Sequence, residues 1–345
     1  IGDFFVMSVQ LAETAEDVSR IAFGFMASKA LFAALHIGIF DKLADSPKTA
    51  AQVAQETRIP VNRVTTLLTA LTGIGLVDRE EETYSNSPGA AAFLVQGAKY
   101  DFGDYLRYQI DGQMYPFLDQ LNEVVDGSLD PDAVDSYQHW MADPEEAALY
   151  SNAQHAGSLG PGRTLARLVD LSGAKNLLDI GGGTGAMSIR LLEANPDLVA
   201  TIIDFPNVAE IGWRFVTEAG MVDRIRYIPG NAMKTAWPTE QDAILMSYLF
   251  SGVPGTEVPR LVGDAFACLA PGGHYMVHDF MVEDDRSGPP MAALWQLQHM
   301  AFTPEARSVT PGWLRARMEE AGFVDIREEE MIPGLTRLLH ARKPG

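Results

Sequence analysis

A glycine-rich turn at residues 181–185 constrains this 345-residue chain more than any other feature of its sequence. The turn follows the apolar run 176–180 and leads into a helix-like segment at residues 186–193. Glycine allows the backbone to turn tightly and allows a ligand to approach it closely. A strand, a glycine-rich turn and a helix in this order predict the start of a doubly wound α/β domain.

Strand-like runs alternate with helix-like segments through the second half of the chain, which predicts a mainly parallel, Rossmann-like sheet. The last two runs are separated by only a few residues, so we expect them to pair as an antiparallel hairpin. The seven runs are residues 176–180, 199–204, 225–228, 243–248, 274–279, 324–328 and 336–341.

The first hundred residues have a different pattern. Residues 18–40 are mostly small and apolar, as in a helix buried against something larger than its own domain. Thr49 begins a capped helix, residues 61–71 have apolar side chains at helical spacing, and residues 79–85 resemble a β-hairpin. This order of elements is typical of a winged-helix domain.

Winged helices often bind DNA, but the charge of this chain argues against that function. The formal net charge is −20, and the second predicted helix carries only Arg63 as a cation. Nucleic-acid binding depends on Lys and Arg contacts to phosphate. We therefore expect this domain to serve dimerisation or to act as a lid, and we expect no nucleic-acid partner.

A helical and aromatic stretch joins the two regions, which gives three predicted segments: a winged-helix domain at 1–104, a linker at 105–168 and a Rossmann-like domain at 169–345. Pro131, Pro144 and Pro161 are expected to break the linker into separate helices. Most aromatic side chains of the linker suit helix packing, but an aromatic segment between two domains is also where a pocket lid is expected.

Composition adds expectations about the environment of the protein. Hydrophobic residues make up 47% of the chain and charged residues 21%, as in globular proteins. No apolar run reaches the roughly 18 residues that span a bilayer, and no signal sequence opens the chain. Cys268 is the only cysteine, which fits a reducing compartment. We therefore predict a soluble, cytoplasmic protein without a membrane partner or a bound metal.

The glycine turn alone leaves two ligands open. Gly181, Gly183 and Ala186 also satisfy the Gly-x-Gly-x-x-Gly/Ala pattern of dinucleotide sites. Asp179, directly before the glycines, would repel a pyrophosphate but favour a cation. Asp204 ends the second strand and can accept both ribose hydroxyls of either cofactor. Asp179 therefore favours S-adenosyl-L-methionine, whose sulfonium is cationic.

The end of the third strand offers further cofactor contacts. Gly230, Asn231, Ala232 and Met233 stand there, where an amide can meet the edge of an adenine and a thioether can meet its face. A simpler interpretation of Asp204 and Asn231 is that they cap turns.

With these motifs the chain resembles the dimeric, plant-type small-molecule O-methyltransferases, which include caffeate and acetylserotonin O-methyltransferases and bacterial relatives. The resemblance rests on the winged-helix region, the glycine turn, Asp204-Phe205, residues 230–233 and residues 269–273. It implies S-adenosyl-L-methionine as cofactor, a homodimer through the N-terminal domain and a substrate held between the domains. The resemblance also implies that Phe205 and Ser247 contact the cofactor. Two positions depart from the usual pattern of the family: Ser247 stands where the family usually has Lys, and Asn231 stands where it usually has Asp.

The catalytic histidine of that family is replaced here. The resemblance aligns it with Ser251, and the residue that orients it falls within Ser308-Val309-Thr310. A hydroxyl acceptor needs a base, which contributes roughly 10²–10⁴ in rate, whereas a thioether sulfur has no proton to lose. The preferred hypothesis is S-methylation of a thioether such as 4-methylthio-2-hydroxybutyrate, as in bacterial dimethylsulfoniopropionate synthesis, by proximity and exclusion of water.

Two sets of side chains are candidates for the acceptor pocket. Aromatic faces can favour a sulfonium, and the candidates are Tyr137, Trp140, Tyr150 and Trp295. Partners for a carboxylate of the acceptor are expected among Arg107, Arg163, Arg307, His155 and His299. Ordinary packing or a solvated charge is the simpler interpretation of each.

Other functions remain open. O-methylation of an aromatic metabolite could use another base, from among His139, His155, His278 and His299. Carbon methylation, and hydroxylation or pericyclic chemistry with the bound cofactor, are alternatives that the resemblance also implies. A cofactor-sensing winged-helix regulator is the alternative from another class, and the acidic charge argues against it.

Overall fold

The computed structural model describes residues 11–129 and 137–345, which form two compact units. The N-terminal unit comprises residues 11–115, and the C-terminal unit comprises the described residues from Pro116 onward. The three segments expected from the sequence stay a prediction, because compactness alone does not assign a function to residues 105–168.

The N-terminal unit has the order of two helices and a hairpin that the sequence predicts. Its elements are α1 (Ala15–Ala22), α2 (Gly24–Ile37), α3 (Ile39–Lys42), β1 (Lys48–Thr49), α4 (Ala50–Thr57), α5 (Val61–Gly73), β2 (Val77–Glu80), β3 (Thr83–Asn86), α6 (Pro88–Phe93) and a π-helix (Tyr105–Met114). Thr49 caps α4 through a capping box with Gln52. The hairpin of β2 and β3 is antiparallel, and β1 pairs with the other edge of β3.

Helix α1 and the first half of α2 are exposed in the single chain, and the expectation that this segment is buried against something larger than its own domain stays a prediction. No side chain of α1 is buried, and Phe23, Phe25 and Met26 are at least half exposed. Burial in the core of this unit begins in the second half of α2, with Phe32. The stretch Ala15–Ile37 is also long and apolar enough to cross a bilayer by length and composition alone, which the sequence analysis did not expect. An exposed apolar surface of this kind indicates an interaction site.

The C-terminal unit contains a seven-stranded sheet. Its strands are β4 (Asn176–Ile180), β5 (Val199–Asp204), β6 (Ile225–Pro229), β7 (Gln241–Ser247), β8 (Leu269–Phe280), β9 (Val324–Ile332) and β10 (Thr336–Arg342). The order across the sheet is β6-β5-β4-β7-β8-β10-β9, and the first five of these are parallel. β10 lies antiparallel between β8 and β9, so the predicted terminal hairpin is confirmed.

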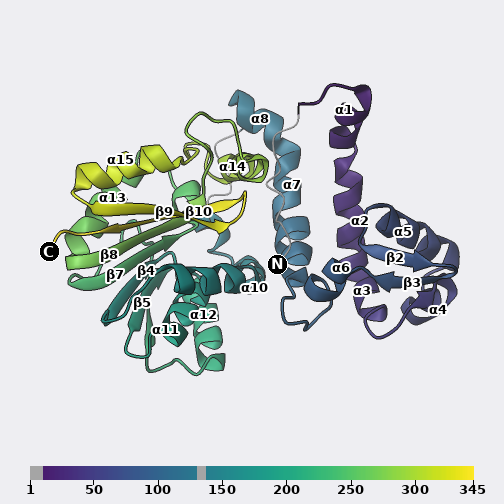
Figure 1. Ribbon diagram of the computed structural model, residues 1–345, viewed down its shortest axis with the longest axis horizontal. Coiled ribbons are helices and arrows are strands. Elements are labelled where there is room, and N and C mark those ends of the chain that lie inside the picture. The colour runs from purple at the N-terminus through teal and green to yellow at the C-terminus, as the bar shows by residue number, and fades with distance from the viewer. Residues whose placement is uncertain (1–10, 130–136) are drawn as a thin grey trace. The chain divides into compact units, whose positions relative to one another are not determined.

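Helices cover both faces of this sheet (Figure 1). α11 (Ala186–Ala194) and α12 (Pro206–Glu218) share one hydrophobic core with the C-terminal end of α10 (Pro144–Leu168). α13 (Val258–Cys268) and α15 (Pro311–Ala321) pack in the core on the opposite face. Three layers of helix, sheet and helix confirm the predicted Rossmann-like fold.

The helices before the sheet correct one sequence prediction. They are α7 (Tyr115–Phe117), α8 (Leu121–Asp126), α9 (Tyr137–Trp140) and α10, and α14 (Pro290–Phe302) follows β8. α10 begins at Pro144 as predicted but continues through Pro161, so the predicted break there is wrong. Proline removes one backbone hydrogen bond, and the packing of α10 against α11 and α12 is enough to maintain the helix. Pro131 lies outside the described residues.

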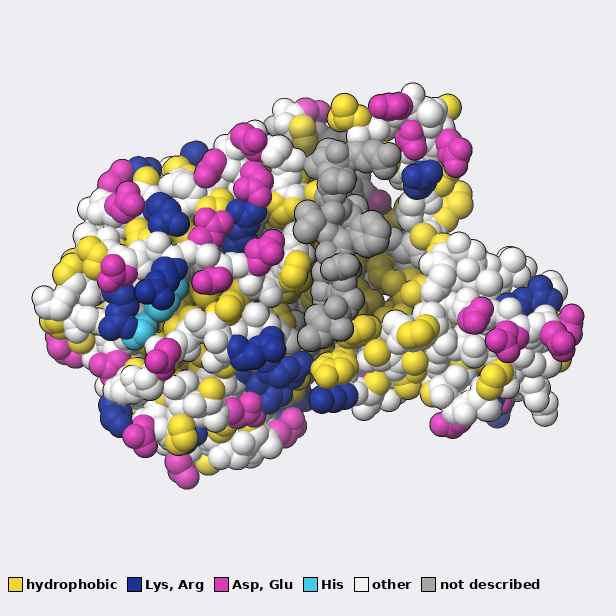
Figure 2. Space-filling view, in the orientation of Figure 1, with side chains coloured by type: hydrophobic (Ala, Val, Ile, Leu, Met, Phe, Trp, Pro, Cys, Tyr) yellow, Lys and Arg dark blue, Asp and Glu magenta, His cyan; other side chains and the backbone are white. Residues whose placement is uncertain are grey.

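Charged side chains are mixed on the molecular face that Figure 2 shows. Acidic and basic side chains are interspersed over the C-terminal unit in that view, apart from one group of adjoining basic side chains at the lower centre. This face therefore carries side chains of both signs, although the formal net charge of the whole chain is −20.

Candidate functional site

A cavity of about 420 Å³ lies at the carboxyl ends of β4, β5, β6 and β7. Ligands of doubly wound sheets bind at this edge. All ten residues expected to contact the cofactor line the cavity: Asp179, Gly181, Gly183, Asp204, Phe205, Gly230, Asn231, Ala232, Met233 and Ser247. The sequence motifs therefore converge on one continuous site.

Asp179 is fully buried in the lining, at the end of β4. Its Oδ2 accepts a hydrogen bond of 2.7 Å from Ser188 Oγ, and its Oδ1 has no hydrogen-bond partner among the described residues. Burial raises the pKa of Asp179 to about 7, the bond from Ser188 lowers it, and the nearby Asp204 raises it. An unpaired buried carboxylate oxygen favours a ligand that brings a donor or a positive charge.

Asp204, at the end of β5, holds the glycine turn. Its Oδ2 accepts a hydrogen bond of 2.7 Å from Gly183 N, and its Oδ1 accepts one of 2.7 Å from Phe205 N. Burial raises the pKa of Asp204 to about 6, although these two bonds lower it. The turn-capping interpretation is therefore correct. Each carboxylate oxygen can still accept a second hydrogen bond, so capping and ribose binding are compatible.

Other strands and helices also support the glycine turn. Gly181 and Gly183 have left-handed φ angles of 68° and 56°, which favour glycine over any other residue. Tyr227 OH, from β6, donates a hydrogen bond of 3.0 Å to Gly183 O. His155 Nδ1, from α10, lies 2.8 Å from Thr184 Oγ1. The backbone that would approach a ligand is therefore fixed from three sides.

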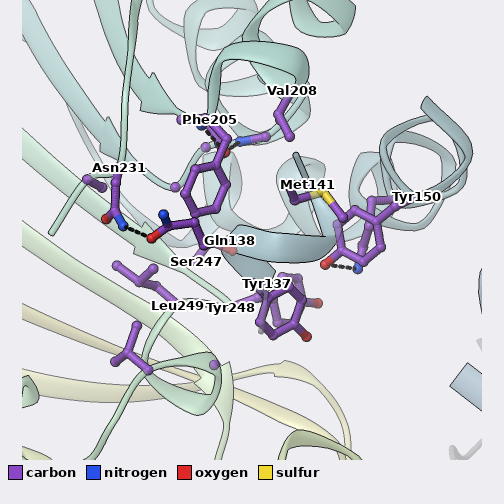
Figure 3. Close-up of a pocket in the computed structure, with 18 of the residues that line it drawn as sticks. Tyr137, Gln138, Met141, Tyr150, Phe205, Val208, Asn231, Ser247, Tyr248 and Leu249 are labelled. Carbon is purple, nitrogen blue, oxygen red and sulfur yellow. Dashed lines mark hydrogen bonds between the residues drawn. The ribbon is translucent and has the colours of Figure 1, made fainter. Parts of the chain in front are cut away.

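Asn231 makes one hydrogen bond at each end of its side-chain amide. Its Oδ1 accepts a hydrogen bond of 2.9 Å from Met233 N, and its Nδ2 donates one of 3.0 Å to Gln138 Oε1 (Figure 3). The turn-capping interpretation therefore holds for Asn231. The second N–H of Nδ2 and the second lone pair of Oδ1 are still available, so capping and contact with the edge of an adenine are compatible.

The charge of the lining distinguishes the two cofactors that the glycine turn permits. The described lining contains the carboxylates of Asp179, Asp204 and Glu305 but no Lys or Arg. These carboxylates repel a pyrophosphate and attract a sulfonium and an ammonium. The residues present thus fit S-adenosyl-L-methionine.

Two family models match the chain. The O-methyltransferase domain covers residues 131–324, and the O-methyltransferase dimerisation domain covers residues 19–96. The chain belongs to this O-methyltransferase family. It is accordingly a methyltransferase that uses S-adenosyl-L-methionine on a small molecule, and the dimerisation domain supports the homodimer that the resemblance implies.

Relatives of this methyltransferase differ in the atom that they methylate. A 3-hydroxy-5-methyl-1-naphthoate 3-O-methyltransferase from Streptomyces sahachiroi is 28% identical over 90% of this chain and 90% of its own. The N,N-dimethyltransferase OxyT from Streptomyces rimosus is 28% identical over 93% of this chain and 94% of its own. Human N-acetylserotonin methyltransferase, solved with S-adenosyl-L-methionine, has the same fold, with a TM-score of 0.84, 22% identity and coverage of 98% of this chain and 100% of that chain.

The dimerisation domain includes the apolar part of α2. Phe25 and Met26 lie within the matched residues and are at least half exposed. In a dimerisation domain, an apolar helix face of this kind is expected to be covered by a second copy of the chain.

The structure divides the predicted acceptor-pocket residues into two groups. Tyr137 and Tyr150 line the cavity. The other five do not line it: Trp140, His155, Ser251, Trp295 and His299.

Two of the aromatic candidates pack elsewhere. Trp140 is buried in an aromatic cluster, where its ring stacks on Phe302 at 5.2 Å and its Nε1 donates a hydrogen bond of 2.9 Å to Glu146. Trp295 stacks on Phe280 with ring centroids 4.8 Å apart. Ordinary packing between aromatic side chains explains both.

Ser251, which the resemblance described above aligns with the catalytic histidine of the family, is 1% exposed in the one-turn helix Phe250–Gly252. Its backbone N–H donates a hydrogen bond of 3.0 Å to Asp279 Oδ2. Gly252 and Val253, the next two residues, line the cavity instead. Position 251 therefore supports the loop after β7 and does not face a ligand.

None of the described residues that line the cavity is a histidine, so no imidazole is placed there to act as a base. Burial lowers the pKa of His155 and of His299 to about 4 and that of His278 to about 3. These imidazoles are therefore neutral at neutral pH and are weak bases. The side chain of His139 lies outside the described residues.

Phe302 and Tyr248 are among the lining residues that the sequence analysis did not identify. Phe302, from α14, stacks on Tyr137 with ring centroids 5.0 Å apart. Tyr248 follows β7 with a left-handed φ of 58°, an uncommon conformation for a bulky residue. Neither position carries a local sequence signal, because ring stacking and backbone strain both arise from the tertiary structure.

The buried carboxyl of Asp179 should make the stability of the protein depend on pH. Its pKa is about 7 when folded, because of burial, against 3.8 when exposed. Between these values the folded state holds a proton that the unfolded state has lost, so a rise in pH lowers the free energy of unfolding. We expect urea unfolding between pH 4.5 and 8 to show this loss, roughly 1–4 kcal/mol, in the unaltered protein. The loss should be smaller in Asp179→Asn but not absent, because burial also raises the pKa of Asp204 and of Asp279 to about 6. Equal pH dependence in both proteins would contradict the assignment, and Asp197→Asn, at an exposed carboxylate, is the matched control.

Proposed function

We propose that this methyltransferase acts on a neutral or cationic aromatic molecule that binds against Tyr137, Tyr248 and Phe302. The observation that carries the proposal is the composition of the cavity lining. Its described side chains are aromatic, aliphatic, thioether, amide and hydroxyl groups together with three carboxylates. Flat apolar acceptors gain from burial against such rings, and an anionic acceptor finds no cation.

Groups of this chain also define how the acceptor is held. When bound, S-adenosyl-L-methionine supplies an electrophilic methyl group. Tyr137 stacks on Phe302 and excludes water from the acceptor. Burial raises the pKa of Tyr137 to about 12, so its hydroxyl stays protonated and orients rather than deprotonates an acceptor. Ser151 Oγ, buried in the lining and without a described partner, offers a further polar contact.

One relative acts by its name on a naphthoate, which is aromatic but carries a carboxylate, and another is an N,N-dimethyltransferase. The first supports an aromatic acceptor, and the acceptor atom of this chain is proposed to be an oxygen, nitrogen or carbon. The neutral or cationic charge proposed for the acceptor depends on the cavity lining alone.

S-methylation of a thioether is the second candidate. No described lining residue carries an imidazole. A sulfur acceptor needs alignment with the methyl group and exclusion of water rather than a base. The carboxylate of 4-methylthio-2-hydroxybutyrate nevertheless has no partner in the described lining, because none of the predicted partners lines the cavity: Arg107, Arg163, Arg307, His155 and His299. An uncharged thioether fits better than this precursor of dimethylsulfoniopropionate.

A panel of acceptors tests the proposal. We expect neutral aromatic hydroxyl and amine compounds to be methylated with kcat/KM at least about tenfold above that of 4-methylthio-2-hydroxybutyrate, as a single unfavourable charge contact costs this much. Mass spectrometry of the products identifies the methylated atom. Glu305→Lys replaces an exposed carboxylate of the lining with a cation. This variant should lower the ratio of kcat/KM for the neutral aromatic acceptors to kcat/KM for 4-methylthio-2-hydroxybutyrate. Faster methylation of the thioether acid by the unaltered protein would contradict an aromatic acceptor.

A further inference from the structure

Three side chains form a hydrogen-bonded row that ends at the cavity. Ser247 Oγ lies 2.9 Å from His278 Nδ1, and His278 Nε2 lies 2.9 Å from Thr336 Oγ1. They belong to β7, β8 and β10, which are neighbours in the sheet. His278 and Thr336 are fully buried, and only Ser247 lines the cavity. Ser247 is therefore the member of the row that can meet a ligand.

Thr336 determines the direction of the hydrogen bonds in this row. Its Oγ1 accepts a hydrogen bond of 3.2 Å from Ile332 N, and His278 Nε2 is the only other group that the described structure places within hydrogen-bonding distance of it. A buried hydroxyl proton without an acceptor is unfavourable, so Thr336 donates its proton to Nε2. A neutral imidazole carries one proton, which must then lie on Nδ1. His278 therefore donates to Ser247 Oγ.

The proton of Ser247 is consequently free to point elsewhere. Burial lowers the pKa of His278 to about 3, which keeps the imidazole neutral and preserves this arrangement at neutral pH. Because Ser247 Oγ is the acceptor in its bond with His278, its own hydroxyl proton is not used within the row. The cavity is the space that Ser247 lines.

His278 also holds the residue that follows Ser247. Tyr248 N donates a hydrogen bond of 2.8 Å to His278 O, and the two rings have centroids 4.4 Å apart. These contacts maintain Tyr248 in its left-handed conformation. One buried histidine therefore fixes two consecutive residues of the lining.

We propose that Ser247 donates a hydrogen bond to an oxygen of the bound ligand, and that His278 and Thr336 are positioning residues that set the direction of this donor. The oxygen belongs either to the amino-acid end of the methyl donor or to the methyl acceptor. The inference depends on the methyltransferase activity of the family but not on the aromatic acceptor proposed above.

The tautomer of His278 is measurable. NMR of the full chain labelled with ¹⁵N in its histidine rings should show Nδ1 of His278 protonated and Nε2 unprotonated. Thr336→Val removes the donor to Nε2 at nearly constant shape, whereas Thr336→Ser retains it and is the matched control. Protonation of Nε2 in the unaltered protein, or an identical ring spectrum in Thr336→Val, overturns the proposal.

Binding measurements separate the two sources of the oxygen. If the oxygen belongs to the methyl donor, Ser247→Ala should bind S-adenosylhomocysteine about tenfold more weakly by calorimetry. If it belongs to the acceptor, calorimetry should be unchanged and the KM of the acceptor should rise about tenfold.

A double-mutant cycle tests whether Thr336 acts through Ser247. Thr336→Val should reproduce part of the Ser247→Ala loss although Thr336 does not line the cavity, and Thr336→Ser should not. The double variant should be no weaker than Ser247→Ala alone. Fully additive losses, or no loss in either measurement, overturn the proposal. Thermal unfolding of each variant confirms that it is folded.

Discussion

Replacement of Asp204 by alanine is expected to weaken the binding of S-adenosyl-L-methionine by about 10²–10³-fold. The substitution removes the acceptors of Gly183 N and Phe205 N, which shape the glycine turn, and also the proposed acceptors of the ribose hydroxyls. Hydrogen bonds to a charged group contribute about 1.5–3 kcal/mol each, and about 1.4 kcal/mol corresponds to a tenfold change in affinity. Isothermal titration calorimetry with the donor or with S-adenosylhomocysteine measures the effect.

Two further variants make the Asp204 experiment specific. Asp197→Ala removes an exposed carboxylate that pairs with Lys175 in the same unit, and should leave affinity unchanged. Asp204→Asn keeps one oxygen acceptor, so its affinity should lie between those of the unaltered protein and Asp204→Ala. If Asp204→Ala binds as tightly as the unaltered protein, Asp204 does not contact the cofactor.

The second large effect is expected from Gly182→Ala. Gly182 does not have a left-handed φ, so crowding rather than backbone strain requires glycine there. An added Cβ would lie 2.5 Å from Asp179 Cγ and 2.8 Å from Ile202 Cγ2. Both neighbours are buried in the sheet, so the turn itself must shift. We expect a loss of stability of about 1–3 kcal/mol and a reduction of cofactor affinity of at least about a hundredfold.

Gly263→Ala is the matched control for Gly182→Ala. Gly263 lies within α13, and an added Cβ would meet nothing within 4 Å. Alanine is favoured over glycine inside a helix by about 0.5–1 kcal/mol, so this variant should be slightly more stable and should bind the cofactor normally. Urea unfolding and calorimetry should therefore separate the two variants. Similar results for both would mean that the turn is not closely packed at Gly182.

The cofactor side of the cavity was predictable because its residues follow strands. Asp179, Asp204, Asn231 and Ser247 each stand at or just after the end of a strand-like run, and parallel strands bring these ends to a common edge. The position of these residues at strand ends was therefore enough to predict that they lie close together. Their hydrogen bonds were less predictable: the sequence left open whether Asp204 and Asn231 cap turns, and the structure shows that both do.

The acceptor side was predicted less well, because it is built from helices. Trp295 and Phe302 both belong to α14, yet only Phe302 lines the cavity. Sequence composition marks an aromatic helix but does not determine which of its side chains meet a given pocket. The same reason accounts for Trp140, which packs in the cluster beside Tyr137 rather than in the lining.

The row from Ser247 to Thr336 could not be inferred from the sequence at all. Its members are 31 and 58 residues apart, and they meet only because β7, β8 and β10 are neighbours in that order. The sequence predicted that the last two strands pair with each other but not that β10 also pairs with β8. His278 was accordingly expected as a candidate base, whereas its buried position favours a neutral, positioning role.

The interior position of β10 has a consequence for biosynthesis. Residues 336–342 are made after every other strand of the sheet, yet β9 joins the sheet only through them. A nascent chain can form the glycine turn and the five parallel strands while β10 is still inside the ribosomal exit tunnel. During that interval β8 has an unpaired edge, so the emerging domain is exposed to edge-to-edge association. His278 also lacks its hydrogen bond with Thr336 until β10 pairs. In such a nascent chain the proposed direction of the Ser247 donor would be set only when β10 pairs with β8.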